Sequence, residues 1–385
     1  MPTYAYTAKT DIADAFRLIP VHPSDYPKLG MTFQGHYFYD KTLPMGCGSS
    51  CRIFEAFSTA IQHMLEFYMP EVKCVHMLDD FFIMAASKET CAQHLTALQQ
   101  ICADIGVPLA PDKTTEPATC TAFLGIELDS VGRLAKLPKD KLNQYSDDIR
   151  QALTHKKLTR HDLESLIGKL SFAAAVVPAR PFLRRLIDLL KQAHRPYHYI
   201  RLTKEVKRDL ETWLNFLNKY NGITYFRALK YVDSTTIHMS SDASHMGFGA
   251  CYGSKWLQAK FPPSWQQYHI TILELFPIFV LISMFGRLMR NANIMFHCDN
   301  EAVTAIINKQ SSKDPIIMNI MRPLILQLVE HNINLRSKHI PGVLNILPDK
   351  ISRFQVTQQL LDENDIDPLP TALPQHLQPR NFEGL

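Results

Sequence analysis

The sequence predicts three consecutive regions: an α+β domain, a basic helical domain and an α/β domain. Residues 1–130 mix strand and helix signals, residues 131–229 are mostly helical in pattern, and residues 230–355 alternate strands and helices. A chain of 385 residues is long enough for two or three domains with separate cores. Its 46% hydrophobic and 20% charged residues are typical of a globular protein. Residues 356–385, rich in Pro and acidic residues, are expected to be a loose tail or linker.

The first region follows the order strand, helix, hairpin, helix, strand. Apolar spacing predicts a helix over 53–69, and two strands follow within 73–84, joined by a tight turn at Asp79-Asp80. A second helix begins after an N-cap at Ser87 and ends at Gly106. This order is typical of a ferredoxin-like unit.

The second and third regions differ in periodicity. Helices are expected over 139–153, 160–176, 181–192 and 203–220. The third region should contain strands at 235–240, 247–252, 293–298 and 333–337, with helices at 271–289, 300–308 and 314–330 and a final short helix. The most apolar stretch, 270–285, contains Glu274 and Pro277 and is shorter than a membrane span. It is therefore expected to be a buried helix that carries one carboxylate.

Positive charge is concentrated in the middle of the chain. Residues 133–227 contain 20 Lys and Arg and 9 Asp and Glu, a net charge of +11, which leaves −7 for the rest because the total is +4. This distribution suits a protein that binds a polyanion centrally. On charge alone, solvated helix faces explain the excess equally well.

Cysteine usage and the N-terminus indicate an intracellular chain. The eight Cys form no C-x2-C pair, so we expect reduced thiols and no structural zinc. The first residues have no apolar signal-peptide core. We expect a protein of the cytoplasm, the nucleus or both, without a membrane partner.

Three carboxylates mark a candidate site in the first region. Asp79 and Asp80 lie between two apolar, strand-like runs, and Asp11 ends a strand earlier in the chain. A plain surface hairpin is the simpler interpretation. However, carboxylates on neighbouring strands, with the small-residue loop LPMGCGSS nearby, suit a pair of divalent metals that hold a triphosphate.

Four carboxylates mark a second candidate site in the third region. Asp242 lies on a strand, Glu274 in the apolar helix, Asp299 at a strand end and Asp349 at a helix start. Each Asp alone could be a helix cap or a surface residue. Glu274 is more informative because an unpaired buried carboxylate costs roughly 3 kcal/mol or more.

Motifs along almost the whole chain resemble known retroelement enzymes. KTDIADAF, LPMGCGSS, MLDD, GVPLAPDKT and FLGIEL resemble the palm motifs of reverse transcriptases. SLIGKLSFA, ARPFLRRLIDL and HIPGVLNILPDKISRFQV resemble DIRS-type, tyrosine-recombinase-bearing retroelements, and the second carboxylate series resembles ribonuclease H. The implied fold is an α+β palm with a ferredoxin-like core and a helical thumb, followed by an α/β ribonuclease H-like domain.

The resemblance implies roles in DNA synthesis. Asp11, Asp79 and Asp80 would hold two Mg2+, with Mn2+ as an alternative, and Asp14 is a rival within the first motif. The residues that would contact the incoming nucleotide or leaving group are Phe16 under the sugar, Met45 and Gly46 in the pocket, and Lys113 as proton donor to pyrophosphate. Phe16 as a core residue and Lys113 as a surface residue are the alternatives. The segment 123–128 would grip the primer end.

The resemblance also implies hybrid cleavage. Asp242, Glu274, Asp299 and Asp349 would hold two further Mg2+, and His339 would assist product release or proton transfer, although a lone His is more often structural. Ser244, Asn300 and Asn345 are plausible supporting contacts. The basic thumb residues Lys169, Arg180, Arg184, Arg185 and Lys191 would contact the duplex backbone.

The expected function is RNA-directed DNA synthesis with ribonuclease H activity. Partners would be an RNA template, a DNA primer, RNA–DNA hybrid and deoxynucleoside triphosphates, with a tyrosine recombinase fused or nearby. Two departures stand out: Met77 replaces the usual aromatic, and a fingers region has no room before Asp11. A ribonuclease H-only fragment and a non-catalytic nucleic-acid-binding remnant are therefore the alternatives.

Overall fold

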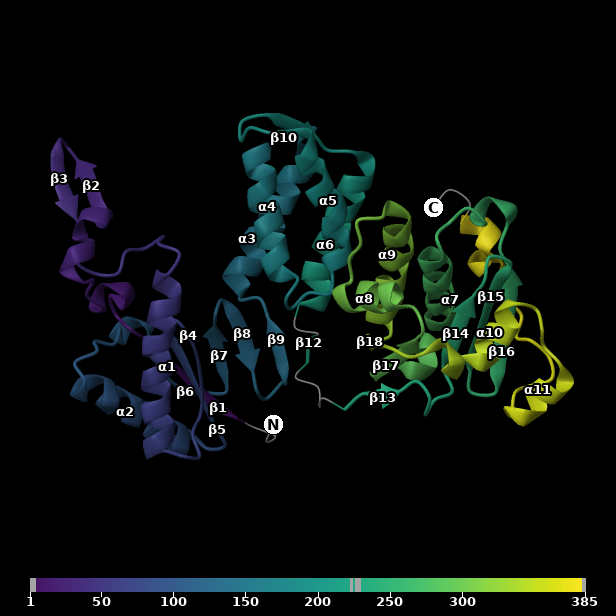
Figure 1. The fold of residues 1–385 in the computed structure, drawn as a ribbon, viewed down its shortest axis with the longest axis horizontal. Helices are drawn as coiled ribbons and strands as arrows, with labels where there is room; N and C mark the ends of the chain where they lie inside the picture. The colour runs from purple at the N-terminus through teal and green to yellow at the C-terminus, as the bar shows by residue number, and fades with distance from the viewer. Residues whose placement is uncertain (1–4, 222–223, 226–229, 383–385) are drawn as a thin grey trace. The chain divides into compact units, whose positions relative to one another are not determined.

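The computed structural model describes residues 5–221, 224–225 and 230–382 (Figure 1). The chain divides into two compact units, one of residues 1–141 and 222–228 and the other of residues 142–221 and 229–385. Each unit is described by itself. We call residues 142–221 the helical domain and residues 229–385 the C-terminal domain; both belong to the second unit.

A four-stranded antiparallel sheet with two helices forms the core of the first unit. Its strands are β1 Tyr6–Asp11, β4 Lys73–Met77, β5 Asp80–Ala85 and β6 Thr115–Ala118, in the order β4-β5-β1-β6. Helices α1 Ser50–Tyr68 and α2 Lys88–Asp104 pack on the sheet and on each other through buried side chains such as Phe54, Ile61 and Leu98. The element order is the strand, helix, hairpin, helix, strand order predicted from the sequence.

The first unit contains two further sheets, one of two strands and one of four. Between β1 and α1, short helices at Ala15–Leu18 and Pro23–Leu29 lead to the exposed hairpin β2 Gly30–Phe33 and β3 His36–Tyr39. A four-stranded sheet in the order β12-β9-β8-β7 contains β7 Cys120–Phe123, β8 Ile126–Asp129, β9 Leu134–Lys136 and β12 Thr224–Tyr225.

The helical domain contains α3 Lys139–Thr154, which begins at the unit boundary, α4 Arg160–Ala173, α5 Arg184–Leu189 and α6 Lys204–Tyr220. Strands β10 Lys157–Thr159 and β11 Tyr199–Arg201 pair across it. Thr159 and Thr203 cap α4 and α6. The helix expected over 181–192 is divided: short 3-10 turns at Arg180–Leu183 and Leu190–Gln192 flank a six-residue α5.

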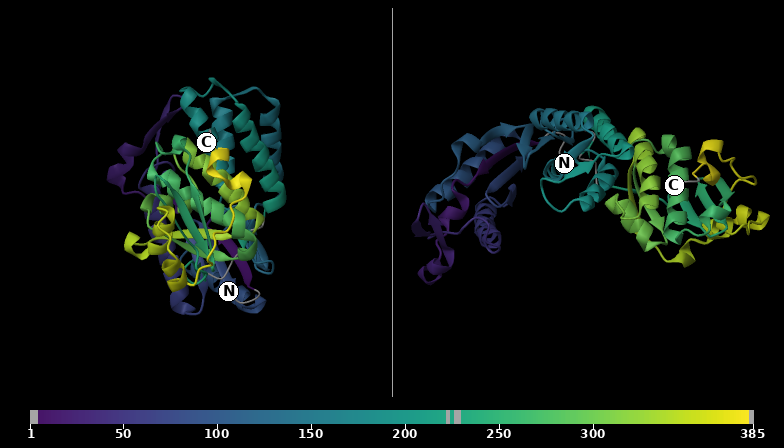
Figure 2. Two further views of the ribbon diagram at one scale, coloured as in Figure 1. Left: turned by 90° about the vertical axis from the view of Figure 1, so that its right-hand side faces the viewer. Right: turned by 90° about the horizontal axis from the view of Figure 1, so that it is seen from above.

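The C-terminal domain places helices around two adjoining three-stranded sheets (Figure 2). One sheet is antiparallel, with β14 Ser240–Ala243, β15 Gly247–Tyr252 and β16 Lys255–Lys260; the other is parallel, with β13 Val232–Asp233, β17 Asn293–Cys298 and β18 Asn334–His339. The helices are α7 Ile270–Phe285, α8 Glu301–Lys309, α9 Pro315–Glu330 and α10 Ile346–Ser352.

Helix α7 is the centre of this core. The stretch Ile270–Met289 is apolar and long enough to cross a membrane, but 72% of its most apolar window is buried inside the domain. Side chains from both sheets and from α8 and α9 surround it. The predicted buried helix is therefore present.

The segment after residue 355 differs from the expected loose tail. Leu361 in α11 Gln358–Glu363 and Ile366 are buried against Trp256, and Leu377 joins the main core. Backbone hydrogen bonds run from Asp367 N to Ser254 O and from Thr371 N to Trp256 O. Pro and acidic residues suggested a linker, but scattered apolar side chains fix the segment along β16, where it covers a sheet edge.

Candidate active sites

Strand pairing brings the first three carboxylates together. Asp11 is opposite Asp80 in the antiparallel pair β1/β5, and the Ile12 N–H donates to the Asp79 carbonyl oxygen at 3.0 Å. Asp14, by contrast, is exposed in a left-handed conformation after the strand. The structure therefore groups Asp11, not Asp14, with the Asp pair.

The hairpin turn lies one residue earlier than predicted. Met77 pairs with Asp80, so the turn residues are Leu78 and Asp79, and Asp80 begins β5. The sequence suggested that both polar residues occupy the turn, but pairing with β1 draws Asp80 into the sheet. Leu78 has a φ of 54°, a strained conformation for a branched residue. Its N–H donates to a Glu55 carboxylate oxygen of α1 at 3.0 Å, which helps to hold the turn.

The carboxylates of this cluster repel one another. Burial, followed by the negative charges of Asp11 and Asp79, raises the pKa of Asp80. The Lys113 ammonium donates to Asp11 Oδ1 at 3.0 Å, and this ion pair raises the pKa of Lys113. Lys113 thus lies at the cluster. A proton-donor role for it stays a prediction.

The remaining predicted nucleotide contacts lie on the segment between β1 and α1. Phe16 packs against Phe54 with ring centroids 5.1 Å apart and contributes to the edge of the core. Met45 is 74% exposed, and Gly46 has a φ of 87°, which favours glycine. Roles for these residues in nucleotide binding stay predictions.

Four carboxylates from four elements act on one another in the C-terminal domain. Asp242 lies on β14, Glu274 on α7, Asp299 directly after β17 and Asp349 on α10. Burial, together with the charges of Asp299 and Asp242 and against a hydrogen bond from Asn300, raises the pKa of Glu274 to about 8. Burial also raises the pKa of Asp242 to about 6, with contributions from Asp299 and Asp349 and an opposing hydrogen bond from Ser352.

Close packing of α10 on β15 completes the cluster. A Cβ at Gly249, which is opposite Asp242 in the sheet, would lie 2.6 Å from Ile351 of α10, so only glycine permits this approach. The fully buried Ser352 hydroxyl then lies 2.6 Å from Asp242 Oδ2. One residue further, the Arg353 guanidinium donates to Asp349 Oδ1 at 2.7 Å.

Sequence reasoning missed Ser352, Arg353 and Cys298. Donor atoms of Glu274, Cys298 and Asp299 lie within 4.8 Å of one another. Burial raises the pKa of the Cys298 thiol to about 12, so it stays protonated at neutral pH. The helical spacing from Asp349 to Ser352 and Arg353 was a usable signal, because residues three and four apart share a helix face.

The predicted supporting residues surround the same cluster. His339 Nε2 is 3.2 Å from the Asp299 carbonyl oxygen, and its side chain is 41% exposed. Asn300 caps α8, the buried Asn345 amide donates to Ser241 O at 3.0 Å, and the Ser244 hydroxyl donates to Ser352 O at 3.0 Å. These contacts fix the loops on both sides of the carboxylates. A role for His339 in chemistry stays a prediction.

Both carboxylate clusters fit divalent cations. Within the described part of the chain, buried Glu274 Oε2 has no hydrogen-bond partner. Burial, and after it the nearby like charges, raises the pKa of Glu274, Asp242 and Asp80, and a cation would relieve the repulsion between these charges. The donors are mainly carboxylate oxygens, the ligands that Mg2+ and Mn2+ prefer. Glu274, Asp242, Asp299 and Asp349 could hold such ions at one site, and Asp11, Asp79 and Asp80 at the other.

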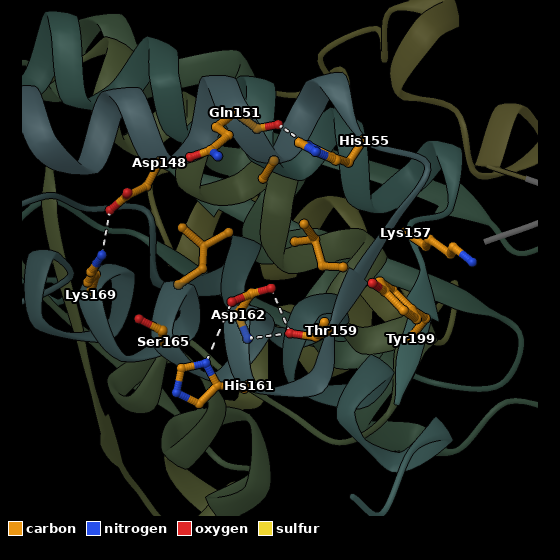
Figure 3. A pocket seen from close by; sticks show the side chains of 13 residues that line it. Asp148, Gln151, His155, Lys157, Thr159, His161, Asp162, Ser165, Lys169 and Tyr199 are labelled. Atoms are coloured by element: carbon orange, nitrogen blue, oxygen red, sulfur yellow. Dashed lines mark hydrogen bonds and ion pairs between the residues drawn. The ribbon is translucent and has the colours of Figure 1, made fainter. Parts of the chain in front are cut away.

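Most of the predicted basic residues of the helical domain form ion pairs with Asp side chains. Lys169 pairs with Asp148 at 2.7 Å, Lys191 with Asp188 at 2.7 Å, Arg184 with the same Asp188, and Arg185 with Asp209 at 2.9 Å. Figure 3 shows Lys169 and Asp148 at one side of a pocket of about 380 Å³ between α3 and α4. Lys157, Asp162, His155 and His161 also line this pocket, so its charge is mixed. Binding of the predicted basic residues, Arg180 included, to the backbone of a nucleic-acid duplex stays a prediction.

A protein-family model matches most of the first unit. The model for "Reverse transcriptase (RNA-dependent DNA polymerase)" matches residues 1–128. Residues 1–128, about a third of the chain, are thus similar to a reverse transcriptase domain. The four-stranded sheet with α1 and α2 is consistent with the palm of such a domain, and the chain is similar to retroviral and hepadnaviral polyproteins.

Relatives of known origin are much longer than this chain. A Gag-Pro-Pol polyprotein of Mason-Pfizer monkey virus is 27% identical over 178 residues, which cover 42% of this chain and 10% of the polyprotein. Protein P of duck hepatitis B virus (strain China) is 24% identical over 186 residues, covering 47% of this chain and 22% of that protein.

Solved structures share the fold at low identity. The foamy viral protease-reverse transcriptase in complex with RNA/DNA hybrid is 16% identical with a TM-score of 0.52, over 96% of this chain and 47% of that chain. The same enzyme in a dRH form with double-stranded DNA is 16% identical with a TM-score of 0.50, over 86% of this chain and 56% of that chain. At this identity the likeness is one of fold alone, and it is consistent with a palm and thumb fold.

Proposed function

We propose that this chain is the DNA-synthesising and hybrid-cleaving part of a retroelement reverse transcriptase. The observation that carries the proposal is the convergence of carboxylates distant in sequence into two clusters. Asp11 meets Asp79 and Asp80 in the palm, and Asp242, Glu274, Asp299 and Asp349 meet in the C-terminal domain. Motifs shared with DIRS-type retroelements suggest the subclass.

In the palm, the proposed reaction is RNA-directed DNA synthesis. When bound, a divalent cation pair would neutralise the triphosphate and lower the pKa of the attacking 3′-hydroxyl. The chain itself supplies the rigid support: the β1/β5 pairing fixes Asp11 against Asp80, and the Glu55 contact holds the turn that carries Asp79. Lys113, next to Asp11, would donate a proton to the leaving pyrophosphate.

In the C-terminal domain, the proposed reaction is hydrolysis of the RNA strand of an RNA–DNA hybrid by a ribonuclease H-like site. Cations held there would activate water and stabilise the leaving 3′-oxygen. Ser352 orients Asp242, and Arg353 orients Asp349. His339, partly exposed beside Asp299, would take up or release a proton as product leaves. Recognition would rest on hybrid shape and 2′-hydroxyls.

The proposal includes Mg2+ as the cation, with Mn2+ as an alternative, and deoxynucleoside triphosphates, RNA template and DNA primer as substrates. The intracellular location and the nearby tyrosine recombinase stay proposals of the same kind. The recombinase rests on the motifs alone, and the location rests on the motifs and the cysteine pattern.

Two assays on the purified chain test the proposal. With Mg2+, we expect cleavage of a labelled RNA–DNA hybrid and extension of a DNA primer on an RNA template, both abolished by EDTA. Cleavage without extension would restrict the function to the C-terminal cluster. Absence of both activities, in a folded chain supplied with either Mg2+ or Mn2+, would refute the proposal.

A further inference from the structure

A cluster of buried charges joins the helical domain to the C-terminal domain. Asp209 of α6 is 2% exposed and Arg322 of α9 is 7% exposed. Asp209 Oδ1 accepts from Arg185 Nη1 at 2.9 Å and lies 3.6 Å from Arg322 Nε. One carboxylate of the helical domain is thus placed between a guanidinium of its own domain and one of the C-terminal domain.

Asn319 of α9 contacts both of these guanidinium groups. Its Oδ1 accepts from Arg185 Nη2 at 3.2 Å and from Arg322 Nη1 at 3.4 Å. Helix α9 lies beside α6 in Figure 1, and it also contacts the turn Arg180–Leu183 that precedes α5. We call Arg185, Asp209, Asn319 and Arg322 the α6–α9 clamp.

The clamp holds its charges in one arrangement. Among the described residues, Asp209 Oδ2 and Arg322 Nε have no hydrogen-bond partner, so their stabilisation depends on the nearby opposite charge. Removing one member leaves the other buried and uncompensated, which strongly disfavours the docked state. The planar guanidinium groups also impose direction, which apolar contacts alone do not.

We propose that Asp209 and Arg322 lock the C-terminal domain onto the helical domain, so that the two move as one body. If the proposed function holds, this lock fixes the spacing between the hybrid bound by the helical domain and the carboxylate cluster that cleaves it. Asp209 is then a positioning residue, remote from the reacting atoms, that sets the lengths of the cleavage products.

A distance measurement tests the lock without any activity. Spin labels are attached to S165C on exposed α4 and L288C in the C-terminal domain, where Leu288 is 68% exposed. The three exposed native cysteines, Cys47, Cys51 and Cys120, are replaced by Ser. Pulsed dipolar spectroscopy should give one narrow distance distribution, and D209A should broaden it at least two-fold.

The matched control is D188A. Asp188 pairs with Arg184 and Lys191 inside the helical domain, and its charge acts on Arg322 less than that of Asp209 does. D188A should therefore keep the narrow distribution. A broad distribution in the parent chain, or an unchanged one in D209A, overturns the proposal. If D209A does not fold, R322Q replaces it, because this variant removes the charge that the C-terminal domain contributes to the clamp. R322Q should broaden the distance distribution at least two-fold, and an unchanged distribution overturns the proposal.

Hybrid cleavage separates this inference from the proposed function. On a hybrid with one defined end, the parent chain and D188A should give a narrow set of RNA product lengths, whereas D209A should give a wider set at similar total cleavage. If the parent chain cleaves no hybrid, the proposed function fails, and the distance measurement still decides the lock. Cleavage with identical product lengths in D209A would refute the positioning role.

Discussion

Mg2+ binding to the C-terminal cluster should release about one proton at pH 7. Glu274, with a pKa of about 8, is then about nine-tenths protonated, and Asp242, with a pKa of about 6, about one-tenth. Metal ligands must be deprotonated, so the fractional protons held by both groups leave on binding. Release should fall to about 0.1 proton at pH 9, where both groups are already charged, and Mg2+ affinity should increase with pH in this range.

Isothermal titration calorimetry in two buffers of different ionisation enthalpy measures this release. Asp79→Asn with Asp80→Asn removes the palm cluster, so that the C-terminal cluster is titrated alone. In that background Glu274→Gln should bind Mg2+ more weakly and release only about 0.1 proton at pH 7. A release below about 0.3 proton at pH 7 in the parent background, or no fall towards pH 9, would refute the assignment of the raised pKa to Glu274.

Three further substitutions probe the same domain. Because burial raises the folded-state pKa of Glu274, the contribution of this group to stability is present below its ordinary pKa and is lost as pH rises towards 8. Without metal, Glu274→Gln should therefore raise the melting temperature by about 5 °C at pH 8 and by much less at pH 4.5. Equal increases at the two pH values would contradict this reasoning. Ser352→Ala should lower Mg2+ affinity and the cleavage rate about 10-fold, because it removes the hydrogen bond to Asp242. Ser352→Thr keeps the hydroxyl and should retain most of the affinity and of the cleavage rate. Equal losses in the two variants would show that Ser352 acts through packing alone. Gly249→Ala should displace α10, because its Cβ would lie 2.6 Å from Ile351, and should destabilise the domain by about 1–3 kcal/mol in urea unfolding; a neutral effect would show that α10 adapts.

Local sequence patterns predicted most of the elements that carry the carboxylates, but the strand expected over 235–240 lies instead at Ser240–Ala243, where it carries Asp242. Alternation and helical spacing placed Asp11 at a strand end, Glu274 in a buried helix and Asp299 directly after a strand, and the structure agrees. These positions follow from the chain's own periodicity. Their convergence into clusters did not follow from periodicity: neighbouring strands suggested it for the first cluster, and the motif resemblance implied it for the second.

Long-range pairing explains where sequence reasoning failed. The turn before β5 shifted by one residue because Asp80 pairs with Asp11, 69 positions earlier. Ser352 and Cys298 were missed because their relevance depends on contacts with Asp242 and Glu274 that neighbouring residues do not reveal. Arg185, expected from the motif resemblance to contact a duplex, contacts the buried Asp209, and duplex binding by Arg185 stays a prediction. Net charge along a sequence does not show which cations already have carboxylate partners.

The central claim is that the chain has two independent catalytic clusters, and a pair of matched variants tests it most directly. In a folded chain with Mg2+, Asp242→Asn should abolish hybrid cleavage and leave primer extension intact, whereas Asp79→Asn should abolish extension and leave cleavage intact. Loss of both activities through either single substitution, with the fold preserved, would contradict the claim.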